Sequence, residues 1–361
     1  MVPPGSILIL VSSTQRRGAE VFGEHLARAL KETGRSTNLL SLHQVSPGAG
    51  VGAAPLFEAS EINGISGLRL RVVRRLRSAI AELQPVLVLA GGGATLKYSV
   101  AALVGMRDGP SLVYSSIGEP EFWARSWWRK KMMSALLSRT RLVTAVSQAT
   151  ADQLVRSFGV NPAKIRVVHP GVPDDYLDID GREANPGRLR ILYLGSMSEE
   201  KDPLAAVAAV SLMESSATLR MVGDGPLIGR LEEESRVAAF PMEVAGPADN
   251  VRDHLRWADV LILTSRTEGL PGVILEAGAA GVPVAAFDVG GVTEAVVEGV
   301  TGLVMPPGDQ HAMAQALDRL ARDPSLRSTM ARAAKERIRG HFLLSHALDR
   351  YRAVLDELLG T

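Results

Sequence analysis

Residues 259–284 read DVLILTSRTEGLPGVILEAGAAGVPV and contain one complete strand–turn–helix unit. The apolar run at residues 260–264 has the length of a buried strand. Gly281 ends a short helix, and Val282-Pro283 leads into the next strand. Pro271 favours the first turn of that helix, because its missing N–H would have no partner there in any case. A strand, a helix and a second strand in this order predict a parallel α/β sheet.

Two glutamates flank the turn of this unit. Glu268 is expected at the carboxyl end of the strand, and Glu276 about one turn into the helix. The backbone N–H groups between them are expected to point out of the helix N-terminus, which is a ready site for an anion. A ligand with hydroxyls at both ends and phosphate in the middle, such as a nucleotide sugar, fits two carboxylates around such a site. The N–H groups in question belong to Leu270, Gly272, Val273 and Ile274.

Similar strand-like runs recur along the whole chain between amphipathic helical stretches. This alternation gives parallel sheets covered on both faces, and it occurs twice. The predicted fold class is therefore α/β, with two doubly wound, Rossmann-like domains. Ligands of such sheets bind beyond the carboxyl ends of the strands, so we expect the two domains to face each other across a cleft. The strands are expected at residues 7–11, 36–42, 86–89, 111–114, 142–145 and 165–168, and at 190–194, 217–222, 242–245, 260–264, 284–286 and 302–304.

The length of 361 residues also favours two domains, because it exceeds what one ordinary core holds. We expect the first domain at residues 1–173, and a polar, turn-rich linker at 174–188. The second domain is expected at 189–340, and residues 341–361 should form a terminal helix that crosses back to the first domain. The Gly-, Pro- and Ala-rich stretch 44–67 is interpreted as a loop.

Composition narrows the class of protein further. The chain has no cysteine, which excludes disulfides, thiolate metal sites and cysteine nucleophiles and is typical of a reducing interior. No signal peptide is recognisable, and no apolar stretch approaches the roughly 20 residues that span a bilayer. We therefore expect a cytoplasmic protein, either soluble or peripheral at the inner face of the membrane.

Charge is distributed unevenly between the two halves. Residues 1–173 hold 21 Lys and Arg against 10 Asp and Glu, a net charge of +11, and the remainder holds 19 against 29, a net charge of −10. One interpretation is scatter over two solvated surfaces. The other is that the first half meets an anionic partner.

A cluster of tryptophans lies within the basic half. Trp123 and Trp127 would share one face of a helix, with Arg129, Lys130 and Lys131 beside it. Tryptophan next to Lys and Arg is typical of an interfacial helix that recognises anionic lipid. The alternative is a partly buried helix that lines an acceptor cleft.

The second half resembles the retaining glycosyltransferases of family 4, which have the GT-B architecture, in the subgroup whose two glutamates are separated by seven residues. The first half resembles them more loosely, through RGAE at 17–20 and AVS at 145–147. The order and spacing of the motifs in the second half carry the resemblance. These are LGSMSEEK at 194–201, VGDGPL at 222–227, SRTEGLP at 265–271, EAGAAGVPV at 276–284, DVGGVTE at 288–294 and GLVMPPGD at 302–309.

The resemblance implies a role for each matching residue. Glu268 would contact the hydroxyls of the donor sugar, Glu276 would accept hydrogen bonds from the nucleotide ribose, and Lys201 would neutralise the diphosphate. Gly18 would let backbone approach the donor from the first domain, and backbone near Ala248 would read the base edge. Glu268 and Lys201 are the expected catalytic residues. The donor-binding set is Gly18, Gly195, Ser196, Lys201, Ala248, Glu268, Leu270, Pro271, Gly272, Val273, Ile274 and Glu276.

Some positions depart from the family pattern. Ser196 stands after Gly195 where the family usually has Arg, and Arg17 precedes Gly18 where the family usually has Gly. Our hypothesis is that Arg17 supplies the charge missing at position 196. Ile117-Gly118 replaces a histidine that is common in the family.

The resemblance implies transfer of a glycosyl group with retention, by a same-face displacement in which the leaving phosphate takes the proton of the acceptor. The donor would be a UDP- or GDP-sugar, and the acceptor a hydroxyl of a lipid-linked, saccharide or natural-product molecule, including an anionic or polyprenyl lipid at the membrane. No cofactor, metal ion or nucleic acid is expected. The alternatives are a nucleotide-sugar epimerase on the same fold and a catalytically silent, glycosyltransferase-like binding subunit.

Overall fold

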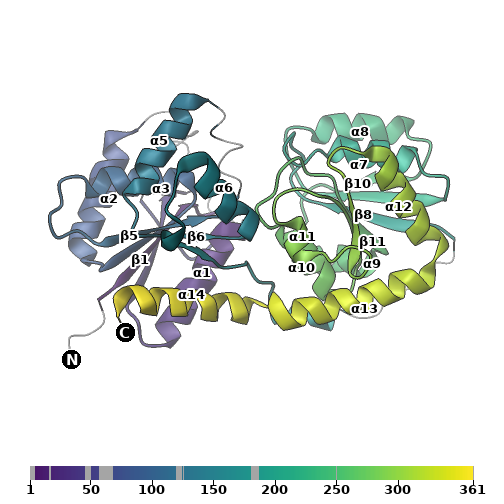
Figure 1. Cartoon of the computed structure of the whole chain (residues 1–361). Helices are drawn as coiled ribbons and strands as arrows, with labels where there is room; N and C mark the ends of the chain where they lie inside the picture. Colours follow the sequence, from purple (N-terminus) through teal and green to yellow (C-terminus); the bar gives the residue numbers. More distant parts are fainter. Residues whose placement is uncertain are drawn as a thin grey trace. The chain divides into compact units, whose positions relative to one another are not determined.

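The computed structural model describes residues 5–15, 18–44, 50–56, 68–118, 124, 126–179, 187–248 and 250–360. The chain divides into two compact units (Figure 1), one formed by residues 1–169 and 348–361 and the other by residues 170–347. The division falls after His169, a few residues before the expected end of the first domain at 173. The last helix thus belongs with the first unit, although it is the most distant segment in sequence.

The first unit is built on a seven-stranded parallel sheet in the order β3-β2-β1-β4-β5-β6-β7. The strand order reverses between β1 and β4, which is the switch point of a doubly wound sheet. The edge strand β3 lies in the stretch that the sequence assigned to a loop, and its two residues are too few for a recognisable pattern. The strands are β1 (Ile7–Ser13), β2 (Thr37–His43), β3 (Ala54–Pro55), β4 (Leu87–Gly91), β5 (Ser111–Ser116), β6 (Leu142–Ala145) and β7 (Ile165–Val167).

Both faces of this sheet are buried, because successive residues of a strand point to opposite faces. Ile7 and Ile9 pack with Leu26 of α1 and Tyr351 of α14, whereas Leu8 and its neighbours pack against α2, α3 and α6 on the other face. The helices of this unit are α1 (Gly18–Glu32), α2 (Leu70–Leu83), α3 (Gly93–Leu103), α5 (Trp127–Ser138), α6 (Gln148–Phe158) and α14 (Leu344–Leu359), with the 3₁₀ helix η1 (Pro162–Lys164).

The second unit has a six-stranded parallel sheet in the order β10-β9-β8-β11-β12-β13. Its strands are β8 (Leu189–Leu194), β9 (Ala217–Val222), β10 (Met242–Val244), β11 (Val260–Leu263), β12 (Val284–Phe287) and β13 (Gly302–Met305). The helices are α7 (Pro203–Ser211), α8 (Ile228–Val237), α9 (Val251–Trp257), α10 (Gly272–Ala279), α11 (Val292–Ala295), α12 (Gln310–Arg322) and α13 (Pro324–His341), with the 3₁₀ helix η2 (Asp174–Asp178).

The element η2 corrects the expected linker. Residues 174–178 form a 3₁₀ helix that contacts α10 and α13, so they are part of the second unit. Arg252 of α9 pairs with Asp175 and lies 5.0 Å from the ring centroid of Tyr176. A polar, turn-rich composition therefore concealed a short ordered element, while residues 180–186 of the expected linker lie outside the described residues.

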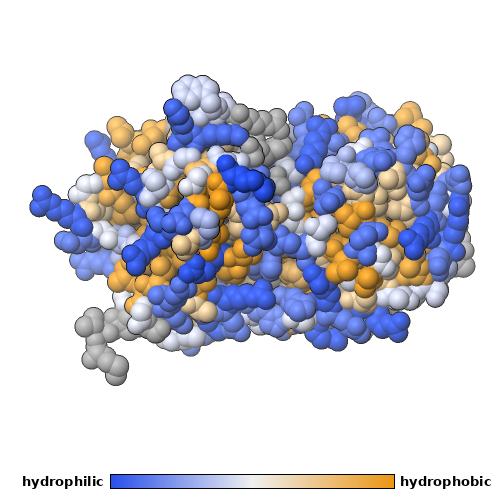
Figure 2. All heavy atoms as spheres, viewed as in Figure 1, coloured by the Kyte–Doolittle hydropathy of each residue, from blue (hydrophilic) through white to orange (hydrophobic). Residues whose placement is uncertain are grey.

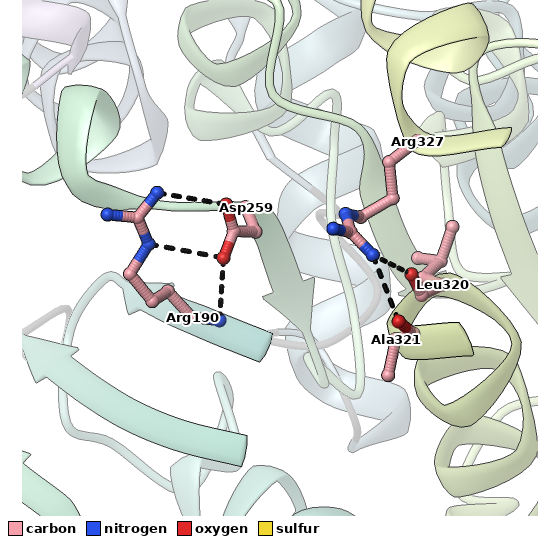
Figure 3. A network of polar contacts seen from close by, with 5 residues as sticks. All are labelled: Arg190, Asp259, Leu320, Ala321 and Arg327. Carbon is pink, nitrogen blue, oxygen red and sulfur yellow. Dashed lines mark hydrogen bonds and ion pairs between the residues drawn. The ribbon is translucent and has the colours of Figure 1, made fainter. Parts of the chain in front are cut away.

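Arginine contacts join elements of the second unit that are distant in sequence (Figure 3). Arg190 of β8 is buried, and its Nε and Nη2 donate to the carboxylate of Asp259, immediately before β11, at 3.1 and 3.0 Å. Arg327 of α13 donates to the carbonyls of Leu320 and Ala321 near the end of α12. The bonds of Arg327 satisfy carbonyls at the end of α12 that have no partner within the helix. The bonds of Arg190 fix β8 beside β11, the two strands whose loops carry the candidate site.

Candidate active site

The centre of the candidate site is an ion pair between the loops after β8 and β11. Glu268 is buried, with 6% of its surface exposed, and its Oε2 accepts a hydrogen bond of 2.8 Å from Nζ of Lys201. Its Oε1 accepts a hydrogen bond of 2.6 Å from Oγ of Ser265. Lys201 keeps 28% of its side chain exposed. Each oxygen of the carboxylate thus accepts a hydrogen bond, and the ammonium group that neutralises its charge is still accessible to solvent.

The loop that carries Lys201 is held in one conformation. The hydroxyl of the buried Tyr193 lies 3.1 and 3.3 Å from the carbonyls of Ser196 and Lys201, to which it donates. Burial raises the pKa of Tyr193, so this donor stays protonated. Asp202, the next residue, has a φ of 43°, a left-handed conformation that a residue with a side chain adopts only when its surroundings impose it.

Contacts with the loop after β11 supply that constraint. Oγ1 of Thr264 donates to the carbonyl of Asp202 at 2.8 Å, and the backbone N–H of Arg266 donates to the carbonyl of Glu200 at 2.9 Å. Nε of Arg266 also donates to Oδ2 of Asp202 at 2.8 Å. The two loops therefore form one hydrogen-bonded cluster that positions Lys201 against Glu268.

The N-terminus of α10 comes four residues after Glu268 in the sequence. The helix begins at Gly272. Pro271 was expected in its first turn and is instead the N-cap residue, immediately before the helix. The N–H groups of Leu270, Gly272 and Val273 have no hydrogen-bond partner within the described part of the chain. The N–H of Ile274 donates to the carbonyl of Pro271 at 3.1 Å, so the expectation that it is free was wrong. Gly272 is exposed, which leaves its amide accessible to a ligand.

Glu276 lies in the second turn of α10. It is half-buried, and its carboxylate has no hydrogen-bond or ion-pair partner among the described residues. Burial raises the pKa of Glu276 to about 7. Tyr176 of η2 is close enough for the charge of Glu276 to contribute, after burial, to raising the pKa of that tyrosine to about 12. Glu276 thus has carboxyl oxygens free to accept hydrogen bonds, and its charge changes near neutral pH.

The remaining donor-side residues of the second unit lie at the carboxyl ends of neighbouring strands. Gly195 follows β8, with its N–H bonded to the carbonyl of Val222 at 3.0 Å, and the side chain of Ser196 is exposed. Gly223 has a φ of 145°, and a Cβ there would lie 1.9 Å from the carbonyl oxygen of Gly195. Only glycine permits this approach of the two loops. Ala248, half-buried, comes four residues after the end of β10.

The other expected site residues belong to the first unit and are not part of this cluster. Gly18 opens α1 and is exposed, with no atom within 4 Å of an added Cβ. Arg17 and Trp123 lie outside the described residues.

Helix α5 carries the remaining aromatic and basic residues. Trp127 and Trp128 are 71% and 51% exposed. Lys131 lies 5.1 Å from the ring of Trp127, and Arg129 lies 5.2 Å from the ring of Trp128. Lys130 is half-buried between them in sequence, and α5 contains no acidic residue. In Figure 2, blue hydrophilic, pale and orange hydrophobic side chains are mixed on the visible face around α5. The exposure of both indoles favours a surface helix over a partly buried one.

Sequence reasoning missed three supports of the ion pair. Ser265, three residues before Glu268, was recognisable as a nearby hydroxyl. The bond from Tyr193 and the left-handed backbone of Asp202 have no signal in a single sequence, because they depend on how two loops meet. Among the described residues, no group of three or more His, Asp or Glu side chains could hold a metal ion. No helix in the same residues is long and apolar enough to cross a bilayer.

Solved structures place this arrangement in a fold class. Anabaena HepE, solved in complex with UDP and glucose, aligns with a TM-score of 0.82 at 19% identity over 98% of this chain and 100% of its own. The sucrose-phosphate synthase of Thermosynechococcus elongatus aligns with a TM-score of 0.80 at 18% identity over 99% of both chains. The chain has the predicted GT-B fold.

Sequence comparisons then define the family. The family model described as Glycosyltransferase Family 4 matches residues 16–176, and that described as Glycosyl transferases group 1 matches residues 188–323. The chain belongs to glycosyltransferase family 4, as its motifs indicated.

Individual relatives match only part of their own length. A D-inositol 3-phosphate glycosyltransferase of Streptomyces avermitilis is 34% identical over 230 residues, which is 56% of this chain and 48% of the relative. The sulfoquinovosyl transferase of Arabidopsis thaliana is 25% identical over 337 residues, which is 87% of this chain and 65% of the relative. The chain spans about half the length of the first of these curated relatives.

Proposed function

We propose that the protein is a retaining glycosyltransferase that moves a sugar from a UDP- or GDP-sugar to a hydroxyl group of an acceptor. The observation that carries this proposal is the Lys201–Glu268 pair, followed four residues later by the unpaired amides that open α10. HepE, which shares the fold, was solved with UDP and glucose. The curated relatives of this chain include glycosyltransferases.

Each part of the donor has a matching group in the second unit. The diphosphate would lie against the N–H groups of Gly272 and Val273, with Lys201 as its cationic partner. The ribose hydroxyls would donate to Glu276, and the sugar hydroxyls to Glu268. A departing nucleoside diphosphate gains negative charge in the transition state, and fixed amides with an ammonium stabilise that gain without a metal ion. Under this proposal, no cofactor takes part.

The proposed reaction is a same-face displacement. The bond from the anomeric carbon to the phosphate oxygen breaks while the acceptor oxygen bonds to the same face of the sugar. The acceptor proton passes to the leaving phosphate oxygen. Retaining glycosidases use a carboxylate nucleophile instead. Here both oxygens of Glu268 already accept hydrogen bonds from Lys201 and Ser265, which supports an orienting role for this carboxylate.

A thermal-shift panel of UDP-, GDP-, ADP- and TDP-sugars tests donor binding. A ligand that binds only the folded state adds about 2.7 kcal/mol at 100 times its Kd, so one base should raise the melting temperature by several degrees. The Lys201→Ala variant should lose this shift. If none of the four families of donors shifts the wild-type protein, the proposal is wrong.

Release of nucleoside diphosphate separates the proposal from its alternatives. A transferase releases the diphosphate and gives a product with the same anomeric configuration as the donor. An epimerase would convert the donor without releasing the diphosphate when an acceptor is present. A silent binding subunit would bind the donor and convert none of it.

We also propose that the acceptor is presented at an anionic membrane surface, through α5. The exposed Trp127 and Trp128 with Arg129 and Lys131 beside their rings are the residues that support this placement. Vesicles containing anionic lipid should retain the protein at low salt and release it at high salt. The double variant Trp127→Ser/Trp128→Ser should bind at least several-fold more weakly, whereas exchange of the exposed Arg339 of α13 should have no effect. Equal recovery with neutral vesicles would contradict the role of charge.

A further inference from the structure

A cavity lies in the first unit, at the edge of the sheet where β5, β6 and β7 begin. It has a volume of about 670 Å³, within the range typical of small-molecule sites. Its walls come from the end of α3 with the loop into β5, from residues 139–141 before β6, and from Lys164 before β7. These are amino ends of adjacent strands. The ligands of doubly wound sheets bind at the opposite edge, so this cavity is separate from the acceptor side of the first unit.

The charges around the cavity all have one sign. Arg107, Arg139, Arg141 and Lys164 line it, and no acidic side chain is among the lining residues. Asp108 follows Arg107 in sequence but does not line the cavity. Four like charges around one hollow repel one another, and an anion bound among them removes that repulsion.

Hydrogen bonds hold the backbone of the wall that carries two of the arginines. Thr140 stands between them and is buried, and both its N–H and its Oγ1 donate to the carbonyl of Leu137, at 3.1 and 2.7 Å. The N–H of Arg141 donates to the carbonyl of Leu112 at 2.8 Å. Nζ of Lys164 donates to the carbonyl of Thr140 at 3.3 Å, which leaves the ammonium two further hydrogens for a ligand. These bonds hold the backbone that carries Arg139 and Arg141, while the two side chains are exposed at the cavity and accessible to an anion.

The facing wall is apolar and is also pinned. Leu103, Val104 and Met106 line it, and Val104 is 64% exposed. Nη1 of Arg77 donates to the carbonyls of Ala102 and Val104, at 3.1 and 2.6 Å, and so fixes the end of α3. A ligand that fills the cavity therefore needs both an anionic and an apolar part.

We propose that this cavity is a second, non-catalytic ligand site that binds a small molecule in which a diphosphate is joined to an apolar group. The cations would hold the diphosphate, and the wall formed by Leu103, Val104 and Met106 would contact the apolar group. Soluble phosphorylated metabolites and membrane-derived diphosphates share this chemistry.

Calorimetric titration at low salt with inorganic pyrophosphate and with geranyl diphosphate tests the site. Arg139→Ala/Arg141→Ala should weaken binding of both ligands at least 10-fold. The matched control is Arg71→Ala/Arg74→Ala, which removes the same charge from exposed positions on α2 outside the cavity. Val104→Ser should weaken geranyl diphosphate several-fold and leave pyrophosphate unchanged.

The pattern across variants decides the outcome. If Arg139→Ala/Arg141→Ala and the α2 control weaken ligand binding equally, the loss reflects the lower net charge of the protein and the proposed site is wrong. Binding that is lost in Lys201→Ala but kept in Arg139→Ala/Arg141→Ala would place the ligand at the donor site and also overturn it. Unchanged melting temperatures of the variants show that each protein is folded. Geranyl diphosphate bound more tightly than pyrophosphate by the wild type favours a lipid source, and equal affinities favour a soluble one.

Discussion

At the scale of single residues, the pair of Lys201 and Glu268 makes a prediction about stability. Lys201→Met keeps the aliphatic stem but leaves the buried Glu268 with the hydrogen bond from Ser265 and without its cationic partner. Removing one partner from a buried charged hydrogen bond costs about 1–3 kcal/mol. Urea unfolding followed through the transition of the second unit should show this loss.

The double variant distinguishes an ion pair from simple loss of packing. Lys201→Met/Glu268→Gln has no uncompensated charge, so it should recover part of the stability lost in Lys201→Met. If the double variant loses as much unfolding free energy as the two single variants together, the two side chains do not interact. In either background, donor-dependent stabilisation should be absent.

Glu276 makes a prediction about pH. Its pKa is raised from 4.5 to about 7, so the native state holds a proton that the unfolded state has lost. The resulting contribution to stability is complete below pH 4.5 and is lost as the pH rises through 7. The wild type should therefore lose stability between pH 5 and 8 relative to Glu276→Gln, which has no such titration. Parallel stability curves for the two proteins would contradict the raised pKa.

Donor affinity should follow the opposite course. Ribose hydroxyls donate to the ionised carboxylate, so the affinity for a nucleotide sugar should increase from pH 6 to 8. This increase should disappear in Glu276→Gln. Isothermal titration with an intact nucleotide sugar is the suitable measurement, because its diphosphate is esterified at both ends and keeps its charge over this range.

At the scale of elements, the sequence predicted the parallel strands well. Strands of a parallel sheet are short, largely buried runs, and the runs predicted at 142–145 and 217–222 have the same bounds as β6 and β9. What the sequence could not predict depends on contacts between elements. The left-handed backbone of Asp202 depends on contacts between two loops of the second unit. The four cations around the cavity of the first unit come from separate connections that meet only when its sheet has formed.

The N-terminus of α10 permits a test that spares the fold. Gly272→Pro removes one of the unpaired N–H groups, while proline is favoured at the first position of a helix. Pro271 already has the extended backbone that a following proline requires, and no atom lies within 4 Å of a Cβ at position 272. Stability should be unchanged or slightly higher. Donor binding should weaken about 10- to 100-fold, the effect of losing a hydrogen bond of about 1.5–3 kcal/mol to a charged group.

Gly272→Ala is the matched control for this helix. It adds a Cβ at the same position and keeps the N–H, so donor affinity should stay close to that of the wild type. If both variants bind the donor equally well, the amide of residue 272 does not contact the diphosphate.

At the scale of the whole molecule, the first unit depends on the last segment of the chain. Tyr351 of α14 is buried in the core of that unit and lies 5.0 Å from the ring of Phe22. Its hydroxyl is hydrogen-bonded to Oγ of Ser115 at 2.8 Å and to Oγ1 of Thr144 at 2.9 Å. These residues belong to β5 and β6, so the helix closes one face of a sheet whose strands precede it by about 200 residues or more.

Because α14 packs on the sheet of the first unit, substitutions in α14 should destabilise that unit. Tyr351→Ala should destabilise the first unit by about 3–5 kcal/mol, because a large buried aromatic side chain is lost. Tyr351→Phe should cost about 1–3 kcal/mol, because it leaves two buried hydroxyls without this partner. Calorimetry should show the first unit melting earlier while the transition of the second unit stays in place, and Arg339→Ala on the exposed surface of α13 should move neither. A shift of the second unit's transition instead would mean that α14 stabilises residues 170–347, and the assignment of the last helix to the first unit would then be wrong.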